Sequence, residues 1–594
     1  MSPPSSEPYT VGQYLADRLH ELGIEHLFAI PGDYCAEWVH KYVEKNPNIE
    51  RIGSTNEMNA GYAADGYARM NGIGAVCVTY SVGAFSLLNP IAGAFVERVP
   101  VVAINGAPST KKRLQFRETG FQWHHLIDDQ DTDLRVYENV TCAAERIADP
   151  ERAPGQIDSA LRACLRESRP VYLEMLEDVY DLPCDPPERP LAVQPGQRSN
   201  PGECDKAVEA IAQHLQQADS AVVWGGVEIE RYNLQDEFQS LVEALDVPYV
   251  TSLLGKGLLS EENARFAGVF DGNGSPQAVQ KLVKDADYVL GLGAWLTDEN
   301  LLGWMFDTGR ATLAYRDVVR DVSTSDPGID RQRSKVYTAV GLRNLLSQLQ
   351  ADAATSLPSF SGTDVAAQTR TQVQADRSSS SPAPDEQITY QGFYDTITEY
   401  VEEDSVVMGG TGLNFFGSLE LPVDTQSGFV SQAAYADIGY VTPASIGVDL
   451  GTDGERVMVF AGDGGFQMTA QCLGTMAEEE LNPIIFVINN GVYGIEQWLA
   501  DPAVFGNDEP FYPLAVIQQW NYSQLPEAFG GKGWRVETYG ELETAVEDAL
   551  NHTGGPLLIE VKVPQKSLPE LAEFKVEAAE KNNGNVEAAL AAAP

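Results

Sequence analysis

The chain has 594 residues, 40 of them basic and 86 acidic, and a net charge of −46 at neutral pH. One hydrophobic core rarely organises so long a chain, so we expect two to four domains, most simply three. The negative field would repel phosphate backbones and anionic membrane surfaces, which argues against nucleic acid and membranes as partners. The charges are interspersed, which is typical of a solvated surface.

The cysteines and the N-terminal segment indicate the compartment. The seven cysteines are odd in number and form no CxxC pair, a pattern that fits neither a disulfide framework nor a zinc cluster. Residues 1–9 lack the basic start and apolar run of a signal peptide, and no segment approaches the roughly 20 apolar residues of a membrane span. We therefore expect a cytoplasmic protein with reduced thiols.

Short apolar runs alternate with amphipathic, alanine-rich segments along the chain, which is typical of strands joined by crossover helices. This pattern predicts an α/β protein of three domains, each a mainly parallel sheet flanked by helices. Proline-rich or polar segments interrupt the pattern and are expected to be linkers. The predicted domains are 9–182, 203–350 and 388–565, the linkers are 183–202 and 351–387, and a C-terminal tail occupies 566–594.

The predicted elements begin with a helix from Thr10. Strands are predicted at 26–30, 75–79, 101–105 and 171–175 in the first domain, at 221–224 and 288–292 in the second, and at 457–461, 484–488 and 557–561 in the third. Gly291-Leu292-Gly293 lacks the further spacing and the acidic residue of a dinucleotide-binding motif, so we interpret it as a turn after a strand. The second domain is then either architectural, which we prefer, or an effector-binding domain.

Two loops in the third domain carry chemistry. Gly462-Asp463-Gly464-Gly465 follows one predicted strand, and Asn489-Asn490-Gly491 ends the next. The carboxyl ends of parallel strands share one edge of a sheet, where free backbone N–H groups favour ligand binding. Glycines allow a diphosphate to approach the backbone, while Asp463 and the Asn490 amide oxygen are hard ligands suited to magnesium. The two loops together predict a magnesium–diphosphate site.

These loops resemble the diphosphate-binding motif of thiamine diphosphate enzymes, and other segments match that family in the same order. The segment from Ser54 to Arg69 looks like the part of the pyrimidine-binding domain whose glutamate contacts the aminopyrimidine ring. That role falls on Glu57. A simpler explanation is an acid at a helix N-terminus that interacts with the macrodipole. The resemblance extends from about Tyr9 to Lys562.

Within the superfamily, the chain is similar to pyruvate, indolepyruvate and branched-chain 2-oxo acid decarboxylases. Asp33, the adjacent His124 and His125, and Glu496 stand where those enzymes keep catalytic side chains. Taken singly, Asp33 could be a turn acid or helix cap, Glu496 an exposed helical charge, and the histidines surface residues. Their joint appearance, with the further matching segments 80–84 and 521–530, favours the functional interpretation.

The resemblance implies thiamine diphosphate and Mg²⁺ as cofactors. It places the metal on Asp463, Asn490 and the backbone carbonyl of Val492, and it makes Ile438 the apolar wedge that bends the cofactor. The implied cofactor-binding residues are Glu57, Thr411, Ala436, Ile438, Gly462, Asp463, Gly464, Gly465, Asn490 and Tyr493.

Departures from the family pattern concern the substrate pocket, for which we predict Phe415, Ile495 and Leu499. Pyruvate-specific members carry tryptophan where Phe415 stands, and an acid is common where this chain has Leu413. A smaller wall residue should admit a longer or branched 2-oxo acid. The run 126–133 is more acidic than usual in the family, and the loop 500–514 is divergent.

The resemblance therefore implies non-oxidative decarboxylation of a 2-oxo acid to an aldehyde and CO₂ through a thiamine diphosphate ylid and enamine. It also implies a cofactor held across a subunit interface, so a homodimer is the smallest active unit and a homotetramer is expected. Two alternatives stay open: a carboligase of the acetolactate synthase type, and an inactive regulatory or scaffold protein that keeps the fold.

Overall fold

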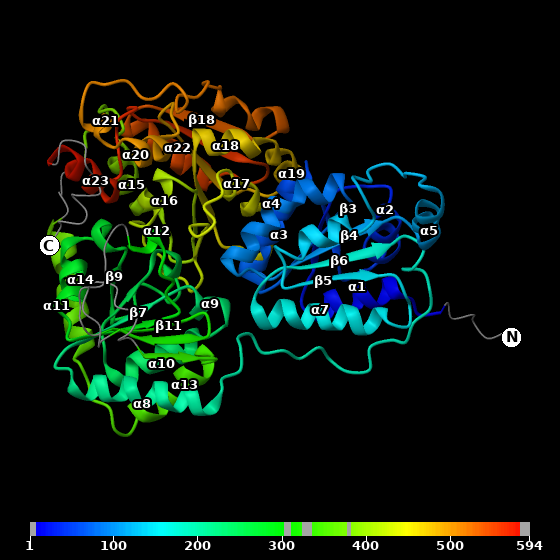
Figure 1. The fold of residues 1–594 in the computed structure, drawn as a ribbon. Coiled ribbons are helices and arrows are strands. Elements are labelled where there is room, and N and C mark those ends of the chain that lie inside the picture. The colour runs from blue at the N-terminus through cyan, green and yellow to red at the C-terminus, as the bar shows by residue number, and fades with distance from the viewer. Residues whose placement is uncertain (1–7, 302–310, 323–334, 377–381, 582–594) are drawn as a thin grey trace. The chain divides into compact units, whose positions relative to one another are not determined.

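The computed structural model describes residues 8–301, 311–322, 335–376 and 382–581. Three β-sheets form, each with flanking helices, which confirms the predicted α/β class (Figure 1). The chain divides into two compact units. One contains residues 1–195, 442–454 and 469–481, and the other contains 196–441, 455–468 and 482–594.

The N-terminal sheet has six parallel strands in the order β2-β1-β3-β4-β6-β5. The four predicted strands are present, and two more, β2 and β5, lie at its edges. The strands are β1 His26–Ala29, β2 Glu50–Gly53, β3 Gly74–Thr79, β4 Val101–Ala107, β5 Ala143–Ile147 and β6 Val171–Leu176. The helices are α1 Val11–Glu21, α2 Ala36–Trp38, α3 Glu57–Asn71, α4 Val82–Glu97, α5 Thr110–Thr119, α6 Thr132–Tyr137 and α7 Ala153–Glu167.

Helices cover both faces of this sheet, α3 and α4 one face and α1 and α7 the other (Figure 1). Helix α1 begins where predicted, because the Thr10 side chain accepts a hydrogen bond from the Gln13 N–H and caps the first turn. Strands β3, β4 and β6 are buried along their whole length. Continuous apolar strands of this kind need helices on both sides.

The second sheet has seven strands in the order β13-β12-β11-β10-β7-β8-β9, and β12 runs antiparallel to both of its neighbours. Its strands are β7 Ala221–Gly225, β8 Tyr249–Thr251, β9 Phe266–Val269, β10 Tyr288–Leu292, β11 Ala311–Tyr315, β12 Val318–Asp321 and β13 Lys335–Thr338. Its helices are α8 Pro201–Gln217, α9 Glu228–Arg231, α10 Gln235–Leu245, α11 Gln277–Asp285, α12 Asp298–Leu301, α13 Leu342–Ala353 and α14 Gly362–Asp376.

The third sheet has six parallel strands in the order β15-β14-β16-β17-β19-β18. Its strands are β14 Val406–Gly409, β15 Phe429–Ser431, β16 Val457–Gly462, β17 Ile484–Asn489, β18 Lys532–Val536 and β19 Leu557–Lys562. Its helices are α15 Tyr390–Ile397, α16 Leu413–Ser418, α18 Asp463–Thr469, α20 Gly494–Ala500, α21 Ala503–Gly506, α22 Tyr539–Leu550 and α23 Glu570–Lys581. Helices α17 Val441–Gly451 and α19 Leu473–Glu478, from the same part of the sequence, fall in the compact unit of the first sheet.

Helix α17 packs so closely on α3 that glycine is required at the contact. A Cβ atom on Gly447 would lie 1.8 Å from the carbonyl oxygen of Ala63, and one on Gly66 would lie 2.1 Å from that of Ala444. Backbone therefore meets backbone between these two helices. The larger residues that helices usually present to one another would separate them.

Two segments differ from the expected linkers and tail. The segment 351–387 contains helix α14, in which Ala366 is fully buried against the second sheet, so much of it is not a linker. The tail contains α23, whose Ala572 carbonyl accepts a hydrogen bond of 2.9 Å from the Trp498 indole. Residues 377–381 of the linker and 582–594 of the tail lie outside the described residues.

All seven cysteines are free thiols, as predicted. Within the part of the chain that the structure describes, no helix combines the length and apolar character needed to cross a membrane.

Candidate functional site

The first cluster of predicted catalytic residues forms at the carboxyl edge of the N-terminal sheet. Nε2 of His124 lies 2.5 Å from Oδ2 of Asp33, and Nε2 of His125 lies 3.8 Å from the other carboxylate oxygen. The structure therefore brings together three residues that are about 90 positions apart, since Asp33 and His124 differ by 91 in sequence. All three side chains are accessible to solvent, with exposed fractions of 48% for Asp33, 56% for His124 and 32% for His125.

Two tyrosines fix this cluster. The Tyr80 hydroxyl donates a hydrogen bond to the backbone carbonyl of His124, and its ring meets the His125 ring edge to face at 5.9 Å. The Tyr34 ring lies 5.0 Å from that of Tyr80 and 5.3 Å from that of His124. His125 itself has a positive φ of 69°, which is unusual for a residue with a side chain. The loop that carries the histidines is thus held by defined contacts, while both side chains stay accessible to solvent.

Asp33 lies in the turn between β1 and α2. It is not the helix cap, because Cys35 is the N-cap residue of α2. The turn packs tightly on the end of β3, where a Cβ on Gly32 would lie 2.5 Å from the Cβ of Thr79. Glycine at this position therefore allows the turn to bring Asp33 to the histidines.

Glu57 is the first residue of α3, and Asn56 caps that helix by accepting a hydrogen bond of 2.8 Å from the Asn59 N–H. The Glu57 side chain is half-buried, and its Oε1 lies 3.5 Å from the position that a Cβ on Gly83 would occupy. The carboxylate therefore points toward the first turn of α4. Its place at a helix N-terminus fits both interpretations of this residue that the sequence left open.

The second group of predicted residues lies at the carboxyl ends of β16 and β17. Asp463 is 1% exposed, and its two carboxylate oxygens accept hydrogen bonds from the N–H groups of Gly464 at 2.9 Å and Gly491 at 2.8 Å. Burial raises the pKa of Asp463 to about 6, and those N–H groups oppose the rise. The Gly462–Gly465 and Asn489–Gly491 loops thus meet at one carboxylate, as predicted from their strands.

Further hydrogen bonds from Val492 and Tyr493 fix the two loops. The Asn490 amide oxygen accepts a hydrogen bond of 3.1 Å from the Val492 N–H, and the Tyr493 hydroxyl donates to the Gly464 carbonyl at 3.4 Å. The Tyr493 ring lies so close that a Cβ on Gly464 would be 2.4 Å from it. Any side chain at Gly464 would displace the tyrosine, so the backbone there stays open to a ligand.

Thr411, Ala436 and Ile438 join the same site. The Thr411 hydroxyl donates to the Asp437 carbonyl at 2.9 Å, and Ile438 Cγ2 lies 3.6 Å from the Cβ position of Gly465. Ala436 has a positive φ of 56°, a conformation that costs energy for any residue with a Cβ. The strained segment is therefore held against the glycine loop.

Of the three predicted substrate-pocket residues, Ile495 packs near the segment that carries Phe415, whereas Leu499 is largely exposed. Ile495 Cγ2 is 3.3 Å from the Cβ position of Gly412, so the start of α20 packs on the segment that leads to Phe415. Phe415 is buried beside Phe429, with ring centroids 6.3 Å apart. Leu499 is 51% exposed, and Glu496 is exposed in the first turn of α20. The structure leaves Glu496 compatible with both a catalytic and a solvated role.

The residues of the third domain fit a metal-bound diphosphate. Burial makes the negative charge of the Asp463 carboxylate costly, and a divalent cation beside it would offset that cost. The carboxylate, the amide oxygen of Asn490 and a backbone carbonyl are oxygen ligands of the type that Mg²⁺ selects. Gly464 and Gly465 leave the backbone accessible beside them.

Sequence reasoning missed Gln432 beside this site. Its side chain is 1% exposed, yet neither atom of its amide has a hydrogen-bond partner among the described residues. Its backbone carbonyl accepts a bond of 3.4 Å from the Thr411 hydroxyl. A buried amide without partners is costly, which marks it as a candidate ligand contact. A glutamine that follows a short strand carries no sequence signal for this role.

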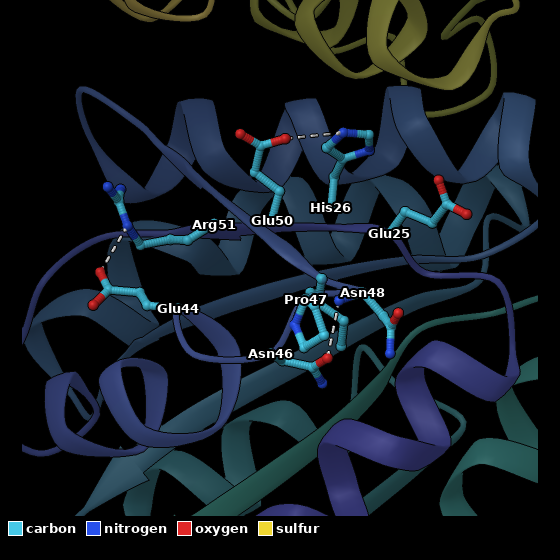
Figure 2. A pocket seen from close by; sticks show the side chains of 9 residues that line it. Glu25, His26, Glu44, Asn46, Pro47, Asn48, Glu50 and Arg51 are labelled. Atoms are coloured by element: carbon cyan, nitrogen blue, oxygen red, sulfur yellow. Dashed lines mark hydrogen bonds and ion pairs between the residues drawn. The ribbon is translucent and has the colours of Figure 1, made fainter.

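A separate open pocket of about 590 Å³ lies at the amino ends of β1 and β2. Figure 2 shows His26 and Glu50 pointing toward each other, and Arg51 toward Glu44, at 3.8 and 3.1 Å. None of the predicted site residues lines this pocket. It also lies at the edge of the sheet opposite to the carboxyl ends that bind ligands in such folds, so we do not assign the active site to it.

Comparison with known proteins identifies the family of the chain. Models of the N-terminal, central and C-terminal domains of thiamine pyrophosphate enzymes match residues 9–132, 208–314 and 413–561. Alpha-keto-acid decarboxylases from Mycobacterium bovis and Mycobacterium tuberculosis are each 32% identical over 577 residues, covering 95% of this chain and 96% of theirs. That of Mycobacterium leprae is 31% identical over 585 residues, covering 97% and 96%. The chain therefore belongs to the family of thiamine diphosphate-dependent 2-oxo acid decarboxylases.

Proposed function

We propose that this decarboxylase converts a 2-oxo acid with a side chain larger than the methyl group of pyruvate, branched or aromatic, into an aldehyde and CO₂. The observation that supports the reaction is the cluster in which the Asp33 carboxylate is hydrogen-bonded to His124 at 2.5 Å and lies 3.8 Å from Nε2 of His125. An aldehyde forms only if the former 2-oxo carbon receives a proton after CO₂ leaves. Imidazole and carboxylate side chains in hydrogen-bond contact are suited to deliver it.

Thiamine diphosphate and Mg²⁺ would be held by the loops around Asp463. Asp463, Asn490 and the Val492 carbonyl are the proposed metal ligands, and Gly464 and Gly465 the proposed diphosphate contacts. When bound, the cofactor supplies a carbon nucleophile and accepts the electron pair released with CO₂. Glu57, with its carboxylate at the start of α3, is proposed to hold the aminopyrimidine ring by a hydrogen bond.

Four side chains are proposed to handle protons and the substrate carboxylate: Asp33, His124, His125 and Glu496. The two histidine rings are 4.6 Å apart, and both face Asp33. The exposure of the cluster provides a route for proton exchange with solvent.

The preference for a larger substrate rests on Phe415. This ring is buried, and a tryptophan in its place would fill additional volume next to Phe429. Pocket volume discriminates between hydrophobic substrates by about 1–3 kcal/mol per methylene group. Phe415 should therefore tolerate side chains that a tryptophan would exclude.

We also propose a homodimer as the smallest active unit, with a homotetramer as the assembled form. The support is the resemblance to enzymes whose cofactor is shared by the pyrimidine-binding domain of one subunit and the diphosphate-binding domain of the other. In this chain Glu57 and Asp463 belong to different compact units.

The direct test supplies thiamine diphosphate and Mg²⁺ and offers pyruvate, 2-oxoisovalerate, phenylpyruvate and benzoylformate separately. Equimolar aldehyde and CO₂, with the larger acids preferred, would support the proposal. CO₂ with a hydroxy-oxo acid in place of aldehyde would indicate the carboligase alternative. Cofactor binding without any product would contradict the proposed reaction, and failure to bind the cofactor would favour the inactive alternative.

A further inference from the structure

Ser81 adopts a strained backbone conformation. It lies in the sequence between Tyr80, which contacts the two histidines, and Gly83, which lies beside Glu57. Its φ is 52° and its ψ is −84°, values close to those of a γ-turn that few residues with a side chain adopt. Ser81 is the N-cap residue of α4, yet its side chain does not cap that helix. Something other than helix capping must therefore stabilise this turn.

Asp133 of α6 makes that contact. Its Oδ2 accepts a hydrogen bond of 2.5 Å from the Ser81 N–H, and its Oδ1 accepts one of 2.9 Å from the Ser81 hydroxyl. Asp133 is 5% exposed, and burial raises its pKa while the bonds from Ser81 oppose the rise. Because both oxygens of this buried carboxylate accept hydrogen bonds from Ser81, Asp133 strongly restrains the backbone of the Ser81 turn.

Helix α6 has a second contact with the same turn of α4. The Tyr137 hydroxyl donates a hydrogen bond of 2.6 Å to the Ala84 carbonyl, and Tyr137 is fully buried. Asp133 and Tyr137 are four residues apart and so lie on one face of α6. The start of α4 is thus anchored on α6 at two points.

The residues that flank Ser81 contact both parts of the proposed catalytic site. Before it, Tyr80 donates a hydrogen bond to the His124 carbonyl and packs on the His125 ring. After it, Gly83 lies beside the Glu57 carboxylate, 3.5 Å from Oε1 to the Cβ position. A change in the Ser81 turn would therefore displace Tyr80, which contacts both histidines, and Gly83, which lies beside Glu57.

We propose that Asp133 is a positioning residue for catalysis, which acts by holding the Ser81 turn and, through it, the placement of His124, His125 and Glu57. This inference rests on the proposed function for its effect on turnover. It does not require Asp133 to touch the substrate or the cofactor. Loss of Asp133 would leave the Ser81 N–H without its partner and the turn without the contact that maintains its strain.

The test compares Asp133→Ala and Asp133→Asn with Asp128→Asn, an exposed acid in the segment just before α6, in the full chain with cofactors. We expect Asp133→Ala to lower kcat by about 10–100-fold, as expected for misplaced catalytic groups, with little change in KM. Asp133→Asn keeps the shape and one acceptor oxygen, so it should fold and lose less. Asp128→Asn should match the wild type.

A second substitution, Ser81→Gly, tests whether Asp133 acts by holding the Ser81 turn or in another way. Because glycine adopts positive φ readily, Ser81→Gly should restore most of the kcat lost in Asp133→Ala, so that the two substitutions are not additive. An equal loss of kcat with serine or glycine at position 81 would overturn the proposal. An unchanged kcat in both Asp133 variants would overturn it as well.

Hydrogen exchange supplies a readout that does not depend on activity. Peptides that cover residues 79–85 and 122–127 should exchange faster in the Asp133 variants than in Asp128→Asn. If the wild-type protein produces no aldehyde, the proposed function fails, while the exchange data still decide whether Asp133 holds the turn. If these peptides exchange at the wild-type rate in the Asp133 variants, Asp133 does not hold the Ser81 turn.

Discussion

The Nε2 atom of His124 lies 2.5 Å from Oδ2 of Asp33, and this contact joins the turn after β1 to the loop after α5. A carboxylate at that distance orients the imidazole ring. His125 approaches the other oxygen of the same carboxylate at 3.8 Å. Asp33 is therefore the shared partner of both histidines.

From this contact we predict that Asp33→Asn and His124→Asn each lower the rate of aldehyde formation by about 100-fold or more, because each removes a group from proton transfer. Steady-state kinetics with 2-oxoisovalerate would measure the loss. The double variant should lose little more than either single variant, since the two side chains act as one unit. His20→Asn, at an exposed histidine of α1, is the matched control. Fully additive losses would contradict a shared role.

We predict that Glu57→Gln keeps the fold and the binding of Mg²⁺ but lowers kcat by about 100-fold or more. Glutamine preserves the size of the side chain beside Gly83 and removes the negative charge. If Glu57 were only an acid at the N-terminus of α3, its replacement would cost about 0.3–1 kcal/mol of stability and leave kcat unchanged. Glu118→Gln, at an exposed position of α5, is the control.

The sequence predicted the parts of the site that follow from strand order. Buried strands such as β16 and β17 are continuous apolar runs, and glycine or asparagine directly after them marks the carboxyl edge of a parallel sheet. The same pattern is weak for β2 and β5, because these edge strands are only partly buried and lack a continuous apolar run. Both were missed for that reason.

Contacts between residues that are distant in the chain could not be predicted from the sequence. Of the asparagine pair, Asn489 is bound to Glu560 at 2.8 Å and to Lys562 at 2.9 Å, so it is structural, whereas Asn490 faces the loop after it. Asp133 stood in a run notable only for its acidity, and nothing in that run distinguishes the one carboxylate that reaches Ser81. Such pairings depend on tertiary packing and not on local pattern.

For substrate choice, we predict that Phe415→Trp shifts the preference toward pyruvate. The larger ring should reduce kcat/KM for 2-oxoisovalerate relative to pyruvate by about 10–200-fold, the range expected for a few methylene groups in a hydrophobic pocket. The ratio within one variant is its own control for protein quality. An unchanged ratio would show that Phe415 does not line the substrate pocket.

The last prediction concerns the pH dependence of metal binding. Burial raises the pKa of Asp463 to about 6, above the ordinary value of 3.8. The folded apoprotein therefore binds this proton more tightly than the unfolded chain. The contribution of this group to stability is greatest below about pH 4 and is lost as pH rises toward 6. Because Mg²⁺ needs the carboxylate, protons compete with the metal below pH 6.

Titration of Mg²⁺ in the presence of thiamine diphosphate should give an apparent affinity that is nearly constant from pH 7 to 8. It should fall about tenfold at one pH unit below the pKa, since only about one carboxylate in eleven is then ionised. Asp463→Asn should abolish the metal-dependent part of cofactor binding at every pH. An Mg²⁺ affinity that is the same at pH 5 and pH 8 would show that Asp463 is not a ligand.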